Sequence, residues 1–121
     1  MDLVLRDGPL SICRVPVAPV TPPAGPIAAV VQLDDEITVV CATGAEPSGA
    51  VIEPGWRAFV VDGPLDFALT GVLASLTVPL AEAKISIFTL STFGTDVVLV
   101  REQDVDAAVS ALSGAGHRVR H

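Results

Sequence analysis

The apolar residues in the second half of the chain repeat with two different periods, which predicts alternating strands and helices. Residues 57–61, 84–90 and 96–100 are apolar runs rich in β-branched side chains, as expected for strands. A helical spacing joins a first set of apolar residues, namely Leu69, Val72, Leu73, Leu76 and Leu80. A second helical face contains Val105, Ala108, Val109 and Leu112. Residues 117–120 are predicted to form a last short strand.

Capping and breaking residues indicate where these helices begin and end. Asp66 precedes the first periodic run and Asp104 precedes the second, and aspartate is a favoured N-cap residue. Pro79 has no amide proton and its ring clashes with the preceding turn. We therefore expect a kink or break near residues 77–78, with a last helical turn that ends at Ala83.

From residue 56 onward the predicted order is strand, helix, strand, strand, helix, strand. This order is typical of ferredoxin-like βαββαβ folds of the α+β class, in which both helices pack on one face of an antiparallel sheet. The first 55 residues are then expected to form a second, incomplete lobe.

The first half of the chain contains strands that are separated by proline and glycine. Residues 10–15, 27–33 and 37–42 are predicted strands. Residues 16–26 are rich in proline, which favours an extended loop over a helix. Residues 43–55 contain glycine and proline at short intervals and are predicted to form turns.

The composition is that of a compact protein. The chain has 121 residues, of which 50% are hydrophobic and only 17% are charged, which argues against disorder. Its apolar runs are shorter than the roughly 18 residues that span a bilayer. The acidic start lacks the basic and apolar regions of a secretory signal. We therefore expect a soluble, cytoplasmic protein with no membrane partner.

The charge argues against nucleic-acid binding. The net charge is −7, and Lys84 is the single lysine of the sequence. Binding to nucleic acid needs clustered lysine and arginine, which displace counterions from the phosphates. The only basic cluster is the short tail 118–121.

The cysteines and histidines do not form a metal-binding motif. Cys13 and Cys41 lie in apolar, strand-like runs, where buried free thiols are the expected state and a disulfide is the alternative. Two cysteines and two histidines are too dispersed for a zinc site. His117 and His121 are interpreted as solvated tail residues, so no metal and no cofactor is expected.

Two segments of the chain resemble the ACT domain family. Residues 63–100 read GPLDFALTGVLASLTVPLAEAKISIFTLSTFGTDVVLV, and residues 33–41 read LDDEITVVC. The combination of GPLDF-x-LTG with IS-x-F-x-x-ST-x-x-TD-x-x-LV is similar to stand-alone tandem ACT proteins. The lobes of those proteins resemble the regulatory lobes of aspartate kinases and an animal cytosolic arginine sensor.

The resemblance implies two lobes, a degenerate ACT-like lobe at residues 1–55 and a complete ACT domain at residues 56–121. ACT domains usually bind amino acids or similar small metabolites at interfaces between lobes or subunits, and they catalyse nothing themselves. Family members normally pair sheet edge to sheet edge, which implies a homodimer. The protein that such a sensor would regulate is unknown.

The predicted start of the first helix is a candidate site for a ligand carboxylate. Backbone amides at a helix N-terminus are free and lie at the positive end of the helix dipole. Residues 67–72 could supply such amides, including those of Thr70, Gly71 and Val72. Gly71 would let a ligand approach the backbone closely. Close packing against a neighbouring strand would explain this glycine equally well.

Three carboxylates and one hairpin are candidate partners for the rest of an amino acid. Asp62, Asp66 and Asp96 could bind an ammonium group or a ligand side chain. By the resemblance, Thr92 and Phe93 lie on a hairpin that borders the same cleft. Asp66 could instead be only a helix cap, and Asp62 could be only part of a turn. Asp96 opens a strand, where aspartate is disfavoured, which favours a specific role.

These observations predict a non-catalytic sensor that binds a small molecule, and the expected ligand is an amino acid. The alternative is a structural or protein-interaction module that keeps the ACT fold without a ligand. An enzyme is not expected, because the sequence contains no GxSxG nucleophile elbow and no phosphate loop. Acidic side chains that point into the cleft would favour the sensor, whereas an apolar filling would favour the module.

Overall fold

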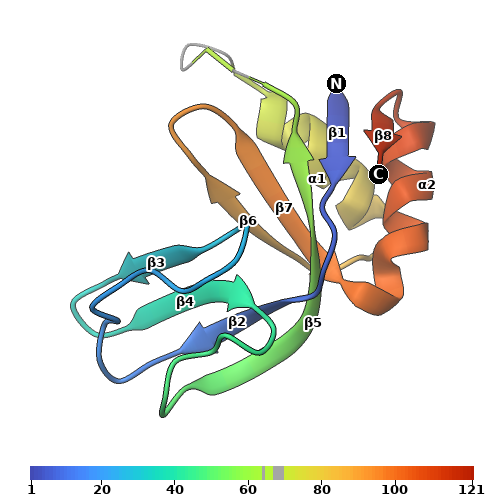
Figure 1. Cartoon of the computed structure of the whole chain (residues 1–121). Coiled ribbons are helices and arrows are strands. Elements are labelled where there is room, and N and C mark those ends of the chain that lie inside the picture. Colours follow the sequence, from blue (N-terminus) through green and yellow to red (C-terminus); the bar gives the residue numbers. More distant parts are fainter. Residues whose placement is uncertain (64, 67–69) are drawn as a thin grey trace. The chain divides into compact units, whose positions relative to one another are not determined.

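The computed structural model describes residues 1–63, 65–66 and 70–121 (Figure 1). The chain divides into two compact units, of which unit 1 contains Met1–Asp7 and Arg57–His121 and unit 2 contains Gly8–Trp56. The division near residue 56 falls where the predicted alternation of strands and helices begins. Met1–Asp7, however, groups with the second half of the chain, although the sequence placed it in a lobe of residues 1–55. No helix among the described residues is long and apolar enough to cross a membrane.

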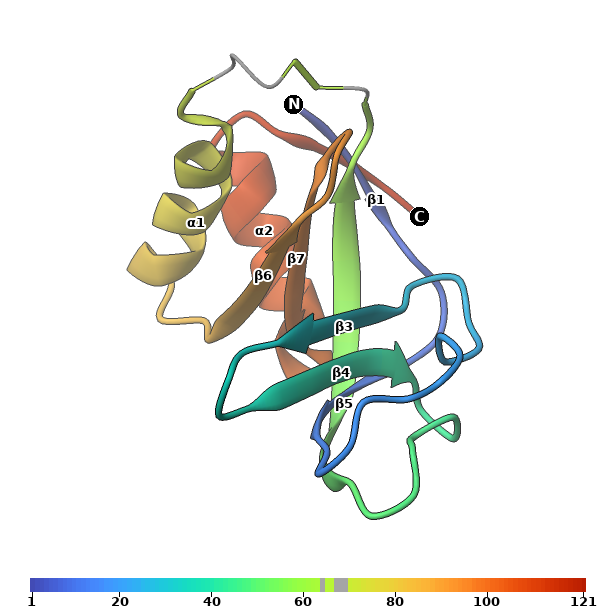
Figure 2. The same ribbon diagram turned by 90° about the vertical axis from the view of Figure 1, so that its left-hand side faces the viewer.

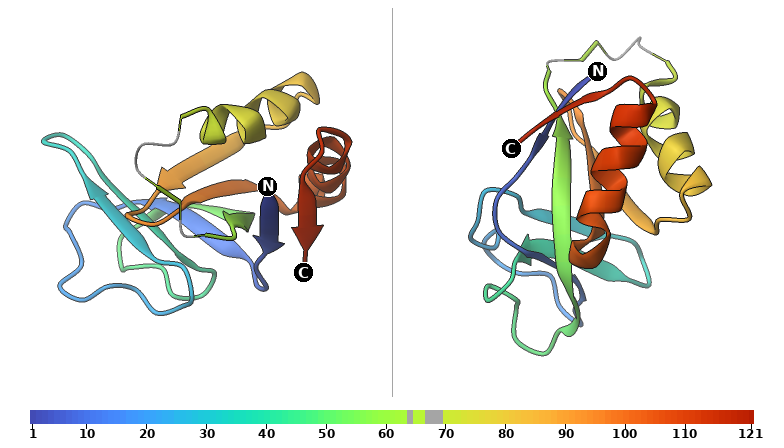
Figure 3. Two further views of the ribbon diagram at one scale, coloured as in Figure 1. Left: turned by 90° about the horizontal axis from the view of Figure 1, so that it is seen from above. Right: turned by 90° about the vertical axis from the view of Figure 1, so that its right-hand side faces the viewer.

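The strands of unit 1 have the order β6–β7–β5–β1–β8. Their bounds are β1 Asp2–Leu5, β5 Val51–Val61, β6 Ile87–Ser91, β7 Asp96–Arg101 and β8 Arg118–Arg120. β1 pairs antiparallel with β5, and β6 pairs antiparallel with β7. The β1–β8 ladder is parallel, as Figure 3 shows near the two chain ends. The expectation of a purely antiparallel sheet was therefore wrong at this edge.

Two helices pack on one face of these strands (Figure 2). α1 spans Val72–Glu82, and α2 spans Val105–Gly114 directly after a short 3-10 turn at Glu102–Asp104. Alternate strand residues and the apolar faces of both helices form one core, as expected from their periods. Its buried members include Leu3, Phe59, Leu76, Leu80, Val98, Val100 and Leu112. The predicted βαββαβ order is confirmed.

Two expectations about α1 were wrong. The helix begins at Val72, so its N-cap is Gly71 and not Asp66. Gly71 adopts a left-handed conformation with φ 76°, which glycine reaches without the steric cost of a side chain. The helix also continues through Pro79 to Glu82 without the expected break.

A distant histidine compensates for the proline inside α1. Pro79 cannot donate to the carbonyl of Ser75 four residues earlier. His117 Nε2 lies 2.9 Å from that carbonyl oxygen and donates to it, because a carbonyl can only accept. His117 Nδ1 is then the acceptor for the Met1 ammonium at 3.2 Å. His117 therefore has a structural position, whereas the sequence indicated a solvated tail.

Because of the turn that ends α1, β6 begins later in the sequence than predicted. The predicted strand began at Lys84, but Lys84 N–H donates to Ala81 O at 2.9 Å and Ile85 N–H donates to Leu80 O at 3.0 Å. Lys84 adopts φ 59°, which turns the chain away from the helix. β6 therefore begins at Ile87.

Unit 2 is built from strands and loops. β2 spans Leu10–Arg14, β3 spans Ala29–Gln32, β4 spans Ile37–Ala42, and the first part of β5 completes the order β3–β4–β2–β5. The three strands predicted here are confirmed, with β3 shorter than expected. The proline-rich segment 16–26 contains no helix or strand, as predicted.

Residues 51–55 were predicted to be turns and are part of β5 instead. Glu53 pairs with Ile12 and Trp56 pairs with Leu10, so β5 has one extra residue between these pairs. Pro54 and Gly55 lie in this bulge, where a missing amide and a φ of 80° at Gly55 are tolerated.

The two cysteines are buried side by side in unit 2. Ser11 pairs with Cys41 and Cys13 pairs with Val39, so the cysteines are diagonal neighbours on β2 and β4. Burial and the neighbouring thiol raise the pKa of Cys13 to about 11, and burial also raises the pKa of Cys41. Both are free thiols, as expected. Diagonal residues have Cα atoms about 7–8 Å apart, which is too far for an unstrained disulfide.

Candidate functional site

The predicted helix start and the predicted hairpin meet in one cleft of unit 1. The cleft has a volume of about 180 Å³. It lies between the connection that follows β5, the first residue of α1 and the β6–β7 hairpin. Its lining residues are Leu65, Asp66, Val72, Ser91, Thr92, Phe93, Gly94, Thr95 and Asp96.

Hydrogen bonds fix the β5–α1 connection against the hairpin. Leu65 N–H donates to Gly94 O at 2.8 Å, and Thr95 Oγ1 donates to Val61 O at 2.6 Å. At Gly63 an added Cβ would lie 3.1 Å from Gly94 O and 3.2 Å from Leu65 N. Contacts of that length are tighter than ordinary packing, so the close approach of the two segments favours a glycine here.

Asp96 is held in place by a neighbour on the facing strand. Ser91 and Asp96 are paired residues of β6 and β7, and Ser91 Oγ donates to Asp96 Oδ1 at 2.7 Å. Thr95 N–H donates to Thr92 Oγ1 at 3.1 Å, and Thr92 N–H donates to Thr95 O at 2.9 Å, which closes the hairpin turn. One carboxylate oxygen of Asp96 is thereby oriented, and the other can accept from a ligand.

The first turn of α1 adds hydrogen-bond donors at the cleft. Ser75 N–H donates to Gly71 O at 2.9 Å, and this bond begins the helical pattern. The amides of Val72, Leu73 and Ala74 precede this bond and lie at the N-terminal end of the helix. The first turn contains no acidic residue that would compete for them. The cleft thus places an oriented carboxylate near the positive end of a helix dipole.

The structure brings five of the eight predicted site residues together. Asp66, Val72, Thr92, Phe93 and Asp96 line the cleft. Thr70 and Gly71 precede Val72 directly but are not lining residues. An added Cβ at Gly71 would meet nothing within 4 Å, so its positive φ explains this glycine and close packing does not. Of the predicted amide donors, residues 67–69 lie outside the described part of the chain.

Asp62 lies elsewhere. It forms a short ion pair with Arg120 of β8 and lines an adjoining cavity of about 300 Å³, which shares Gly94 and Thr95 with the cleft. Sequence reasoning missed Ser91 and Thr95, which hold Asp96 and the connecting segment. Ser91 could have been found from its place in the sequence. It and Asp96 flank a four-residue turn, and residues that flank such a turn are paired across a hairpin.

The described residues offer no evident metal centre. No group of three or more histidine, cysteine, aspartate or glutamate side chains in that part of the chain could hold a metal ion. Both ring nitrogens of His117 are occupied by hydrogen bonds. Within the same residues, the cleft of unit 1 is lined by carboxylates and hydroxyls and by no basic side chain.

Comparison with known proteins finds regulatory and sensor proteins. A family model described as "ACT domain" matches residues 51–114. A bovine protein named cytosolic arginine sensor for mTORC1 subunit 1 is 37% identical over 68 residues, which are 52% of this chain and 21% of that protein. Its human counterpart is 42% identical over 45 residues, 37% of this chain and 14% of that protein. The chain therefore matches only a small part of these relatives.

Solved structures match over nearly the whole chain. A protein from Agrobacterium tumefaciens has a TM-score of 0.88 and 31% identity, and the match covers 99% of this chain and 96% of that one. The ligand-free regulatory subunit of aspartate kinase from Thermus thermophilus has a TM-score of 0.64 and 14% identity, with 93% and 95% coverage. At that identity the second match shows a shared fold only.

Proposed function

The chain belongs to the ACT domain family, and we propose on this basis that it is a non-catalytic regulatory protein that binds an amino acid in the cleft of unit 1. The observation that carries the proposal is Asp96, whose carboxylate is oriented by Ser91 at 2.7 Å in a cleft that also contains the first residue of α1. A zwitterion needs both an anion and a set of amide donors, and the cleft supplies both.

The chemistry assigns one end of the ligand to each side of the cleft. The α-carboxylate accepts from the amides at the start of α1, and the ammonium donates to Asp96, with Asp66 as a second acidic neighbour. Each charge-assisted hydrogen bond contributes about 1.5–3 kcal/mol. Thr92 and the exposed ring of Phe93 border the ligand side chain. Thr70 and Gly71 set the direction of the first helical turn.

The regulatory part of the proposal follows the family. We propose that residues 1–55 are a degenerate ACT-like lobe, that residues 56–121 are the complete ACT domain, and that the protein acts as a cytoplasmic homodimer. The animal relatives are named for sensing arginine, and the bacterial structural relative is named a regulatory subunit. By analogy, occupancy of the cleft is reported to a second protein, and no cofactor takes part.

Two observations favour the alternative of a protein-interaction module. Phe93 is 86% exposed at the tip of the β6–β7 hairpin, and large exposed aromatic side chains often contact a partner protein. The cleft of about 180 Å³ is also below the usual range of about 300–1,000 Å³ for ligand pockets. A second copy or partner that covers the hairpin would enlarge the enclosed volume.

Thermal unfolding against a panel of amino acids tests the proposal. An amino acid at 100 times its dissociation constant should stabilise the protein by about 2.7 kcal/mol, which is a shift of several degrees. The shift should be lost in Asp96→Asn and retained in Asp106→Asn, which changes an exposed carboxylate on α2. No shift for any amino acid with the protein folded would favour the interaction module. A shift that persists in Asp96→Asn would place the ligand outside the cleft.

A further inference from the structure

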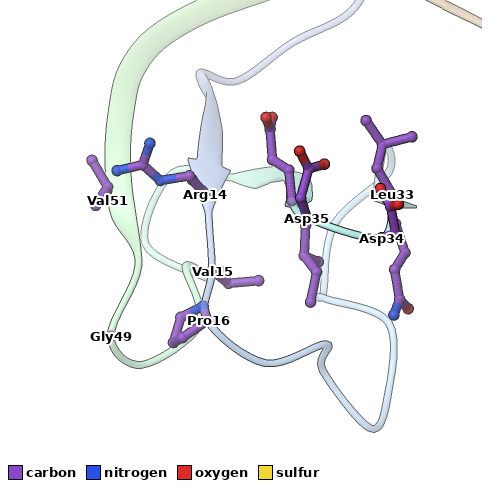
Figure 4. A pocket seen from close by; sticks show the side chains of 11 residues that line it. Arg14, Val15, Pro16, Leu33, Asp34, Asp35, Gly49 and Val51 are labelled. Atoms are coloured by element: carbon purple, nitrogen blue, oxygen red, sulfur yellow. The ribbon is translucent and has the colours of Figure 1, made fainter.

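Unit 2 contains a cavity of its own, with a volume of about 480 Å³ (Figure 4). It is formed by the end of β2, the turn between β3 and β4, and the start of β5. Its lining includes Arg14, Val15 and Pro16 from one segment and Leu33, Asp34, Asp35 and Glu36 from another. This volume lies within the range of small-molecule sites, which is about 300–1,000 Å³.

Opposite charges are separated across this cavity. Arg14 is paired with Thr38 of β4 and with Val51 of β5, which places it on the sheet. Figure 4 shows the Arg14 side chain pointing toward Val51, away from Asp34 and Asp35. Among the described residues, Arg14 has no ion pair. The guanidinium and the carboxylates therefore remain available to a ligand.

The β3–β4 turn holds its three carboxylates close together. Leu33 N–H donates to Glu36 O at 2.8 Å, which closes the turn. Thr38 Oγ1 donates to Glu36 Oε1 at 3.3 Å. Three carboxylates in one short turn repel each other, and a bound cation relieves that repulsion. An acidic turn alone is usually only solvated, and the cavity with Arg14 on its other side distinguishes this turn.

Apolar side chains also line the cavity. Val15 is buried, whereas Leu33 and Val51 are 57% and 58% exposed although both line the cavity. Exposed aliphatic side chains beside charged groups suit a ligand whose middle is aliphatic. A lone cation would leave Arg14 without a partner, and a lone anion would be repelled by the turn.

We propose that this cavity is a second binding site, for an aliphatic molecule with a carboxylate at one end and a cationic group at the other. The three carboxylates and one guanidinium leave an excess of two negative charges, so the ligand that fits best has a net positive charge. A basic amino acid meets these conditions. The carboxylate contacts Arg14 beside Val51, the aliphatic chain crosses the cavity, and the distal cation contacts the β3–β4 turn beside Leu33.

Three related compounds test this assignment in the intact chain. Lysine carries all three features, norleucine lacks the distal cation, and 1,5-diaminopentane lacks the carboxylate. Titration at low ionic strength, followed by backbone amide NMR shifts, should move residues 14–16 and 33–37 with lysine. Norleucine and 1,5-diaminopentane should bind there at least about tenfold more weakly. Equal binding of all three compounds, or no shift in these residues, would overturn the proposal.

Two variants that each remove one charge assign the contacts. Arg14→Gln should reduce lysine binding to the level of 1,5-diaminopentane and leave that diamine unchanged. Asp35→Asn should weaken both cationic compounds and leave norleucine unchanged. The matched control is Asp96→Asn, which removes the proposed cleft site of unit 1 but should not alter shifts at residues 33–37. If Asp96→Asn abolishes those shifts, or if Arg14→Gln changes nothing, unit 2 has no site of its own.

Discussion

Unit 1 covers one face of its strands with two helices, whereas unit 2 contains no helix among residues 8–56 and packs loops against its strands. In unit 1 the fully buried side chains include Phe59 and several leucines. In unit 2 one buried cluster contains Cys13, Val15, Val39 and Cys41, with Ala50 packed against it. The comparison shows two ways to bury apolar strand residues, under the apolar faces of helices in unit 1 and, in this cluster of unit 2, without a helix.

Polar hydrogen bonds also have different roles in the two units. Buried Ser11 in unit 2 donates to Glu46 Oε2 at 2.7 Å, and Gly44 N–H donates to Glu46 Oε1 at 2.9 Å. These bonds hold the loop after β4 and lower the pKa of Glu46, with the Ser11 bond as the main cause. In unit 1 the comparable bonds, from Thr95 and Leu65, hold the segments around a cleft. Polar contacts therefore fix a loop in one unit and a candidate site in the other.

The largest expected effect is the loss of a buried leucine from unit 1. Leu80→Ala should lower the free energy of unfolding by about 2–5 kcal/mol in urea titrations, because Leu80 is fully buried in α1. Val39→Ala in unit 2 should cost less, because valine loses fewer atoms. The control is Val78→Ala on the same helix, which is 51% exposed and should cost well under 1 kcal/mol. Equal costs for Leu80 and Val39 would remove the contrast between the cores.

The buried thiols of unit 2 predict a loss of stability at alkaline pH. The pKa of Cys13 rises from 9.0 to about 11 on folding, mainly through burial. Between these values the unfolded state releases a proton that the folded state keeps, so stability falls as pH rises. The loss should reach about 2 kcal/mol by pH 11. The chain has no tyrosine whose titration would overlap.

Urea titrations at several pH values between 8 and 11 measure this loss. Cys13→Ala should reduce the pH dependence, whatever its effect on stability at pH 8, and the part that remains is expected from Cys41, whose pKa is also raised by burial. An unchanged slope in Cys13→Ala would show that the thiol is not the titrating group.

Gly63→Ala tests how tightly the site of unit 1 is assembled. The new methyl group would lie 3.1 Å from Gly94 O, so the connection and the hairpin must move apart. We expect a cost of about 1–2 kcal/mol, together with weaker ligand binding. Gly114→Ala is the matched control, because its methyl group would meet nothing within 4 Å. It should stabilise the chain by about 0.4–1 kcal/mol. A neutral Gly63→Ala would show that the two segments are loosely joined.

The smallest expected effect concerns the proline inside α1. His117→Ala should cost about 0.5–1.5 kcal/mol, because it removes the donor to Ser75 O. In a Pro79→Ala background the same change should cost less, since the substituted alanine would supply an amide to that carbonyl. A double-mutant cycle measures the difference. A coupling of zero would mean that the histidine does not replace the missing helical bond.

Periodic apolar patterns predicted the helices and strands that have one apolar face packed in the core. β4, β7 and α2 were correctly located, and so was the order of elements in unit 1. The failures came from contacts between residues far apart in sequence. Pro79 is tolerated because of His117, and Pro54 is tolerated because of a bulge opposite β2. Neither compensation is visible within a local window.

The candidate site was predictable to the extent that it depends on one hairpin and one connection. Thr92, Phe93 and Asp96 belong to a single hairpin, so their convergence followed from local sequence. Asp62 does not line the cleft and pairs instead with Arg120 of the last strand. The sequence around the β3–β4 turn of unit 2 did not indicate that Arg14 lines the same cavity.

The central claim is that the cleft of unit 1 binds a free amino acid by both of its charged ends. The most direct test is an NMR titration of the isotopically labelled chain with the amino acid that gives the largest thermal shift, and with its methyl ester and its N-acetyl derivative. The account predicts saturable amide shifts at residues 91–96 and 72–75 with the free amino acid and at least about tenfold weaker binding of either derivative. Equal binding of the blocked derivatives, or shifts confined to other residues, would contradict it.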